Sequence, residues 1–275
     1  MCSTCGCSQP AGAVKIHKVN LNELHVAADH TAHHHGFGTA HTHEHHNEHH
    51  HHHSGEKTVI QLEQDILGKN NLLAERNRGY FEAKHIAAFN LVSSPGSGKT
   101  ALLERTLGDL KDQMPFFVIE GDQQTNNDAE RIAATGAPVV QINTGKGCHL
   151  DAEMIRQATK ELNPVDHAVV FIENVGNLVC PALFDLGESA RVVIISVTEG
   201  DDKPLKYPDM FHSSQLCIIN KIDLLPYVPF DVEKVKANAR KVSHITEFIE
   251  LSAYTGQGMQ QWYEWLQKQQ QHTDH

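Results

Sequence analysis

SSPGSGKT, at residues 93–100, is the stretch that decides the fold. An apolar run at 86–92, typical of a buried strand, precedes it. A segment with helix-forming composition, 100–111, follows it. A strand, a glycine-containing loop ending in Lys-Thr and a helix together form the context of a phosphate-binding loop. Ser93 stands where that motif usually has glycine, and the turn chemistry of the next three residues compensates for it. The sequence therefore predicts a nucleotide-binding α/β domain.

The residues of this loop each have a chemical task. Gly96 and Gly98 allow backbone N–H groups to turn inward around phosphate oxygens, and the helix that follows adds its positive end. Lys99 is expected to reach the β- and γ-phosphates, and the hydroxyl of Thr100 to bind Mg²⁺. A glycine-rich turn without a ligand is the alternative. The predicted phosphate-binding residues are Gly96, Ser97, Gly98, Lys99, Thr100 and Ala101.

Strand-like and helix-like segments alternate through the rest of the chain. This alternation predicts a P-loop NTPase fold, with a mainly parallel sheet covered by helices on both faces. A further amphipathic helix is expected ahead of the loop, at 58–80, packed on the domain or on a second copy. The other expected helices are 126–135, 150–162 and one from 258 into the Gln-rich tail, and the other expected strands are 116–120, 138–143, 168–172, 192–197, 215–220 and 247–251.

A second motif, NKID at residues 220–223, indicates which base is bound. The carboxylate of Asp223 can accept hydrogen bonds from both N1 and N2 of guanine, whereas adenine would leave it unpaired. Asn220 and Lys221 complete the motif, and the backbone of Ser252 and Ala253, at the end of the next strand, could close the guanine pocket. The predicted nucleotides are GTP and GDP.

Two acids at predicted strand ends are candidates for holding Mg²⁺ or its waters. Asp122 follows the second strand and Glu173 follows the fourth, and ligands of open α/β sheets bind at these carboxyl ends. The alternative is that both are solvated loop acids. Asp128 is interpreted as a surface acid in the first turn of a helix. With Lys99 and Thr100, Asp122 and Glu173 make up the predicted catalytic group, in which no catalytic base is identifiable, so slow turnover is expected.

The first 53 residues differ in composition from the rest. They hold fifteen of the 22 histidines, and the part from Val26 onward has almost no aliphatic residues for a core. We expect a disordered Cys/His-rich arm at 1–53 and a P-loop GTPase domain at 54–275. The histidines are interleaved with other residues, unlike those of a purification tag, and this favours nickel storage by the arm.

The overall composition indicates where in the cell the protein is expected and which classes of partner are disfavoured. The net charge of −11 disfavours nucleic acid, because an acidic domain repels a phosphate backbone. No run of about 18 apolar residues is present, so no membrane insertion is expected. Without a signal pattern at the N-terminus, the expected location is the cytoplasm.

Two groups of cysteines could bind a transition metal. Cys2, Cys5 and Cys7, with the α-amino group, offer a donor set that suits square-planar Ni²⁺, although tetrahedral Zn²⁺ also accepts thiolates. An exposed terminus without a metal is the alternative. Cys148-His149 and Cys180 each follow a predicted strand, and on the residues alone they could equally be ordinary core positions. Cys217, within an apolar run, is predicted to be core.

Six motifs in order give the chain a close resemblance to the HypB family, the nickel-incorporation GTPases of nickel–iron hydrogenase maturation, over essentially residues 58–265. The resemblance implies GTP hydrolysis with Mg²⁺, nucleotide-dependent homodimers, the accessory protein HypA as partner and the hydrogenase large subunit as an indirect one. It also assigns metal binding to the cysteines and histidine of GKGCH and NLVCP, and relates the N-terminal cysteines to a high-affinity nickel motif. The motifs are SSPGSGKT, EGDQQTNND, GKGCHLD, ENVGNLVCP, NKID and LSAYTGQG.

Three other functions remain open on the sequence. A metabolic kinase could share the phosphate loop, although NKID argues against it. A nickel or zinc store could carry a regulatory or vestigial nucleotide site. A urease-type nickel chaperone could share the fold, but the N-terminal cysteines and the CH…C pairing disfavour it. In the preferred interpretation, nucleotide state changes the metal affinity of Cys148, His149 and Cys180.

Overall fold

One mixed sheet organises the computed structural model, which describes residues 14–19, 59–123, 127–145, 147–243 and 247–273. Its order is β1-β4-β3-β5-β2-β6-β7-β8, and every pair is parallel except β1 with β4. The carboxyl ends of β2 to β8 therefore meet at one end of the sheet. The strands are β1 (Lys15–Lys18), β2 (Ala87–Ser93), β3 (Phe116–Asp122), β4 (Val139–Asn143), β5 (Val169–Glu173), β6 (Ala190–Ser196), β7 (Leu216–Asn220) and β8 (Glu247–Glu250).

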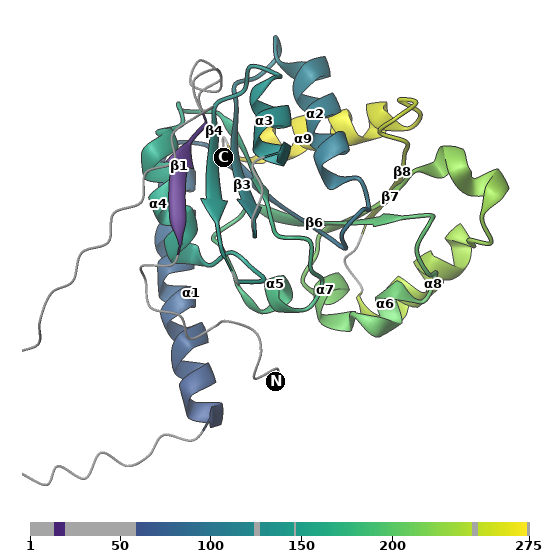
Figure 1. Ribbon diagram of the computed structural model, residues 1–275, viewed down its shortest axis with the longest axis horizontal. Helices are drawn as coiled ribbons and strands as arrows, with labels where there is room; N and C mark the ends of the chain where they lie inside the picture. The colour runs from purple at the N-terminus through teal and green to yellow at the C-terminus, as the bar shows by residue number, and fades with distance from the viewer. Residues whose placement is uncertain (1–13, 20–58, 124–126, 146, 244–246, 274–275) are drawn as a thin grey trace, which may run out of the picture.

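Helices cover both faces of this sheet, as predicted (Figure 1). Apolar side chains of α2, α3 and α9 pack on one face, and those of α1, α4, α7 and α8 pack on the other. The central strand β2 is buried along its whole length, which explains why its sequence is apolar without alternation. The helices are α1 (Val59–Ala83), α2 (Lys99–Leu110), α3 (Asn127–Ala133), α4 (Ala152–Leu162), α5 (Cys180–Leu183), α6 (Lys203–Lys206), α7 (Pro208–His212), η2 (Ile222–Tyr227), α8 (Val232–Val242) and α9 (Met259–His272).

The first strand corrects one expectation. Lys15 to Lys18 lie inside the segment expected to be a mobile arm, yet they pair antiparallel with β4, from Lys15 opposite Asn143 to Lys18 opposite Val140. The backbone N–H of Val19 extends the pairing by donating to Val139 O at 3.1 Å. Residues 15–19 thus belong to the sheet, and the parts 1–13 and 20–53 of the expected arm lie outside the described residues.

The long helix α1 is attached to the domain by polar contacts as well as by its apolar side chains. Buried Asn77 donates to the carbonyl oxygens of Ala152 and Leu186, at 2.8 and 3.0 Å. One heptad earlier, Asn70 donates to Asp185 O and accepts from Ala152 N. Ile60 near the start of the helix is 66% exposed, so the contact with the domain is made by the C-terminal part of α1. None of the helices among the described residues is long and apolar enough to span a membrane.

Candidate functional site

The phosphate loop leaves β2 and enters α2 through two glycines with left-handed backbone. Gly96 has φ 77° and Gly98 has φ 92°, values that L side chains rarely adopt. A Cβ at Gly98 would lie 2.5 Å from Nδ2 of Asn220, so only glycine fits there. The guanine motif holds the loop in place: Asn220 Nδ2 donates to Ser97 O at 2.9 Å, and Lys221 Nζ donates to Gly96 O at 2.7 Å. The two predicted motifs therefore form one continuous site.

A cavity of about 410 Å³ opens over this loop. The whole loop from Ser93 to Ala101 lines it, together with the ends of β3 and β5, including Asp122 and Glu173. Asp128 and Arg131, from α3, also line it and form an ion pair with each other at 3.0 Å. Asp128 lies in the first turn of α3 with its side chain 42% exposed, in line with its interpretation as a surface acid, and it also lines the cavity.

Glu173 joins the phosphate loop to the end of β5. Its Oε1 accepts a hydrogen bond of 2.7 Å from the hydroxyl of Thr100 and lies 3.2 Å from Nζ of Lys99. Its other oxygen, Oε2, is buried and has no hydrogen-bond partner among the described residues. A buried carboxylate oxygen beside a threonine hydroxyl suits a hard divalent cation, which prefers oxygen ligands. The residues present therefore fit Mg²⁺, and Asp122 lines the same space.

Glu120 is a site residue that sequence reasoning missed. It lies two residues before Asp122 in β3, lines the same cavity and is buried. Burial raises its pKa to about 9, and repulsion from Glu173 and Asp122 adds to this, with Lys99 acting in the opposite direction. Glu120 is therefore neutral at pH 7 in the absence of a cation. Lys203 was also missed: its Nζ, from the segment after β6, donates to the Ser94 hydroxyl at 2.6 Å.

The guanine side of the site is organised around Asn220. Its Oδ1 accepts from the backbone of Lys221 at 2.7 Å and of Ala253 at 3.1 Å. The N–H of Ser252 donates to Gln257 O, so both predicted pocket residues use their backbone donors within the chain. Asp223 differs, because its buried Oδ1 has no hydrogen-bond partner among the described residues. An unpaired acceptor at this position suits a base that presents N–H donors.

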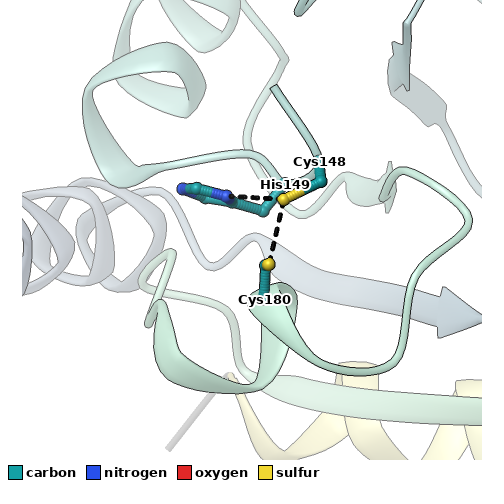
Figure 2. Close-up of side chains that lie close together, drawn as sticks. All are labelled: Cys148, His149 and Cys180. Atoms are coloured by element: carbon teal, nitrogen blue, oxygen red, sulfur yellow. Dashed lines mark hydrogen bonds between the residues drawn. The ribbon is translucent and has the colours of Figure 1, made fainter. Parts of the chain in front are cut away.

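Cys148, His149 and Cys180 come together although they are remote in sequence (Figure 2). One ligand atom from each lies within 4.8 Å of the other two. Cys148 Sγ is 2.9 Å from Cys180 Sγ and 3.8 Å from His149 Nδ1. Two sulfurs and an imidazole are donors for nickel or zinc. The three residues could therefore hold such a metal ion.

The environment of His149 keeps its imidazole available as a ligand. Its ring stacks on Phe184, with centroids 3.9 Å apart and an interplanar angle of 22°. Burial lowers its pKa, and Asp151 only partly opposes this, so the ring is neutral at pH 7. A neutral ring nitrogen binds metal directly, whereas an imidazolium would first have to lose a proton.

The other cysteines divide into two groups. Cys217 in β7 is completely buried in the core, as predicted, and burial raises the pKa of its thiol. Cys2, Cys5 and Cys7, the predicted N-terminal metal ligands, lie outside the described residues.

Comparisons with known proteins give concordant results. The sequence model for the family "CobW/HypB/UreG, nucleotide-binding domain" matches residues 87–250. The chain is 49% identical to hydrogenase maturation factor HypB of Escherichia coli (strain K12), over 98% of this chain and 99% of that protein. It is 54% identical to hydrogenase maturation factor HypB of Azotobacter chroococcum mcd 1, over 86% of this chain and 75% of that protein.

Two solved structures also resemble the chain. Hydrogenase maturation factor HypB from Archaeoglobus fulgidus superposes with a TM-score of 0.69 at 41% identity, covering 74% of this chain and 99% of that one. HypB from Helicobacter pylori, solved in complex with nickel, gives the same TM-score at 38% identity, covering 74% and 96%. At 41% and 38% sequence identity, these two likenesses indicate a shared family as well as a shared fold.

Proposed function

The chain belongs to the HypB family of hydrogenase maturation factors, and from this premise we propose that it uses GTP hydrolysis to control the delivery of nickel to a nickel–iron hydrogenase. The observation that carries the proposal is the cluster of Cys148, His149 and Cys180 on the two segments that follow β4 and β5. Glu173, in contact with the phosphate loop, ends β5 only seven residues before Cys180. Nucleotide and metal sites therefore share a segment.

The nucleotide half of the proposal rests on complementary chemistry in the cavity. Lys99 places a positive charge where the β- and γ-phosphates are expected, and Thr100 and Glu173 are the groups that would hold Mg²⁺, with Asp122 nearby. The cation would neutralise the charge that develops on the phosphate oxygens during hydrolysis. Asp223, with its unpaired oxygen, would select guanine. Hydrolysis is expected to be slow because no catalytic base is identifiable in the sequence.

The metal half rests on the donor set. Nickel is the proposed cargo, supported by the nickel complex of the Helicobacter pylori relative, and zinc fits the same two thiolates and imidazole. Cys2, Cys5 and Cys7 are proposed as a second nickel or zinc site, and the histidines of residues 1–53 as a nickel reserve. These roles follow from the chemistry of the residue types alone.

The proposed partners follow from the family. We propose a homodimer whose formation depends on GTP, a HypA-like accessory protein that exchanges nickel with it, and indirect contact with the hydrogenase large subunit. A two-fold axis near the metal cluster would bring two such sites together.

Hydrolysis would serve delivery if it changed the metal site. The γ-phosphate with Mg²⁺ can order loops that relax after hydrolysis, and the segment after Glu173 is in position to respond. By linkage, a nucleotide that changes nickel affinity must have its own affinity changed by nickel to the same degree. Nickel titration with GDP and with a non-hydrolysable GTP analogue measures this coupling directly.

Two measurements test the function as a whole. Phosphate release from GTP without an acceptor distinguishes a GTPase from a metabolic kinase. Nickel incorporation into the hydrogenase large subunit, compared between the intact chain and Lys99→Ala, distinguishes delivery from storage. A store with a vestigial nucleotide site would support incorporation equally in both, and that result would contradict the proposal.

Urease maturation is a second candidate function. A relative from Helicobacter hepaticus, 47% identical over 66% of this chain and 75% of that protein, is named hydrogenase/urease maturation factor HypB. Nickel incorporation into apo-urease in the same assay would establish that the chain serves both enzymes.

A further inference from the structure

A buried chain of polar side chains connects the segment after Glu173 with both halves of the metal cluster. It consists of Asn174, Asn90, Glu188 and Arg191, from the β5–α5 segment, β2, the α5–β6 loop and β6. Each of these residues is buried, and the most exposed of them, Glu188, is only 8% exposed. The members hydrogen-bond to one another in the interior, where such bonds are stronger than in water.

Asn174 is the branch point of the chain. It directly follows Glu173, and its Nδ2 donates to Asn90 Oδ1 at 3.2 Å. Its Oδ1 accepts from the backbone N–H of Leu150 at 3.3 Å and of Val175 at 3.0 Å. Leu150 is the neighbour of His149, so this hydrogen bond attaches the first half of the metal cluster to the residue after Glu173.

Leu150 also packs against Gly121, in the wall of the cavity over the phosphate loop. A Cβ at Gly121 would lie 2.8 Å from Cδ1 of Leu150, so the Leu150 side chain fills the space that a larger residue would need. Gly121 lies between Glu120 and Asp122 in the wall of the cavity. The backbone that carries Cys148 and His149 is thus held between the ends of β3 and β5.

The other branch leads to Cys180. Asn90 Nδ2 donates to Glu188 Oε1 at 3.0 Å, and the same oxygen accepts from Arg191 at 3.1 Å and 2.9 Å. Arg191 then donates to Ala182 O at 3.2 Å and to Phe184 O at 2.8 Å. These carbonyls lie at the end of α5, the short helix that begins at Cys180. A one-turn helix cannot satisfy its own terminal carbonyls, so the guanidinium fixes its position.

The two branches meet again at the metal cluster, because the ring of Phe184 stacks on His149. Both branches therefore start at Asn174, next to Glu173 of the nucleotide site, and both end at the metal cluster of Cys148, His149 and Cys180. We propose that Asn174, Asn90, Glu188 and Arg191 are positioning residues that convert the nucleotide state at Glu173 into a change in the spacing of the three metal ligands. This inference rests on the proposed function and names the residues that would carry its coupling.

Asn90 offers the sharpest test, since among the described residues its side chain hydrogen-bonds to Asn174 and Glu188 and to no residue of the phosphate loop or the metal cluster. Asn90→Leu has similar volume and removes both of its links. Arg191→Lys breaks the chain of hydrogen bonds at a second, independent place. Lysine retains a positive charge beside Glu188, but its ammonium group cannot reproduce the planar set of donors with which the guanidinium reaches the carbonyls of Ala182 and Phe184. Thr106→Val is the matched control, because Thr106 is equally buried but bonds to Leu102 O and Trp262 on the opposite face.

The measurement is nickel titration of the full chain with GDP and with a non-hydrolysable GTP analogue. All samples carry Cys2→Ser, Cys5→Ser and Cys7→Ser, so that thiolate-to-nickel charge-transfer absorbance reports only the cluster of Cys148 and Cys180. The parent is expected to show a ratio of the two nickel dissociation constants of about fivefold or more. Asn90→Leu and Arg191→Lys should reduce the ratio to within about twofold of unity, and Thr106→Val should leave it at the parent value.

Retention of the parent ratio in Asn90→Leu and Arg191→Lys would overturn the inference, and so would an equal loss of the ratio in Thr106→Val. If Asn90→Leu does not fold, Arg191→Lys against Thr106→Val decides. If the chain with Cys2, Cys5 and Cys7 intact hydrolyses GTP and supports hydrogenase maturation, a ratio of one in the parent would overturn the inference but leave the proposed function standing. Absence of GTP hydrolysis and of hydrogenase maturation in the chain with these cysteines intact would contradict the proposed function itself.

Discussion

The hydroxyl of Thr100 donates a 2.7 Å hydrogen bond to Oε1 of Glu173, which joins the phosphate loop to the last residue of β5. Lys99 lies 3.2 Å from the same oxygen. One carboxylate thus touches both the lysine that is expected to reach the phosphates and the threonine that is expected to bind Mg²⁺, and it connects the start of α2 to the end of β5.

Glu173→Gln should lower kcat for GTP hydrolysis by about 100-fold or more, the size of effect seen when one group that stabilises transition-state charge is removed. Glutamine can still accept from Thr100, but it lacks the charge that would hold Mg²⁺. Phosphate release at saturating GTP, measured over a range of Mg²⁺ concentrations, checks this. Glu161→Gln, an exposed position on α4, is the control, and equal rates for the two variants would remove Glu173 from the site.

Asp223→Asn should exchange the preferred base. The carboxylate can accept from two N–H groups of guanine, whereas asparagine offers one acceptor and one donor group. We expect GTP affinity to fall by about 100-fold or more and xanthosine triphosphate, which has an oxygen in place of the 2-amino group, to bind better than it does to the parent. Competition against a fluorescent nucleotide measures both. Unchanged GTP affinity would show that Asp223 does not contact the base.

Glu120 should make stability depend on pH in the absence of Mg²⁺ and nucleotide. Its pKa in the folded chain is about 9, against an ordinary value of 4.5. Because the folded value is the higher one, its contribution to stability is complete below about pH 4.5 and is lost as the pH rises towards 9.

Glu120→Gln, which stays neutral, should therefore melt at a higher temperature than the parent at pH 8.5 and differ little at pH 5. Each kcal/mol corresponds to roughly 2–4 °C for a domain of this size. Thermal unfolding at the two pH values, in the presence of a chelator, is the measurement. A difference that is the same at both would mean that the effect comes from packing and not from ionisation.

Nickel storage by the arm should be tested without disturbing the sheet. Removal of residues 1–53 would also remove β1 and leave the edge of β4 unpaired. Replacement of the histidines from His25 to His53 by glutamine avoids this, and it should lower the nickel bound per chain in equilibrium dialysis. His212→Gln with His272→Gln, both exposed, is the control. Equal stoichiometry in the parent and the arm variant would exclude storage by the imidazoles.

Local motifs predicted most of the fold and the centre of the site. The strand before the phosphate loop, the helix after it and the NKID turn are each specified by residues that are adjacent in sequence, so their positions were predicted to within a few residues. Helix α8 was missed, although Asp231 caps it by accepting from Lys234 N and its apolar residues Val235 and Ala239 are buried. The aspartate before an apolar helical pattern could have been recognised in the sequence as the start of a helix.

Other features had no local signal. Strand β1 is four residues long and exists through its pairing with β4, more than 120 positions away. The high pKa of Glu120 comes first from its burial in the fold and then from repulsion by Glu173, which comes from another strand. Asn90 is the one amide of β2, and only the fold reveals that it hydrogen-bonds to Asn174 and Glu188. Such long-range polar contacts are set by tertiary packing, so they could not be predicted from one sequence.

The direction of β1 determines where the N-terminal metal ligands can travel. Because Lys15 pairs with Asn143 at the carboxyl end of β4, the chain ahead of it departs from the same end of the sheet as the phosphate loop and Cys148. Seven residues lie between Cys7 and Lys15, so the Cα atoms of these two residues can be at most about 29 Å apart. The pairing of β1 therefore limits how far Cys7 can lie from the carboxyl end of β4, and an exchange of metal between the terminal thiols and the cluster of the same molecule would have a rate independent of protein concentration.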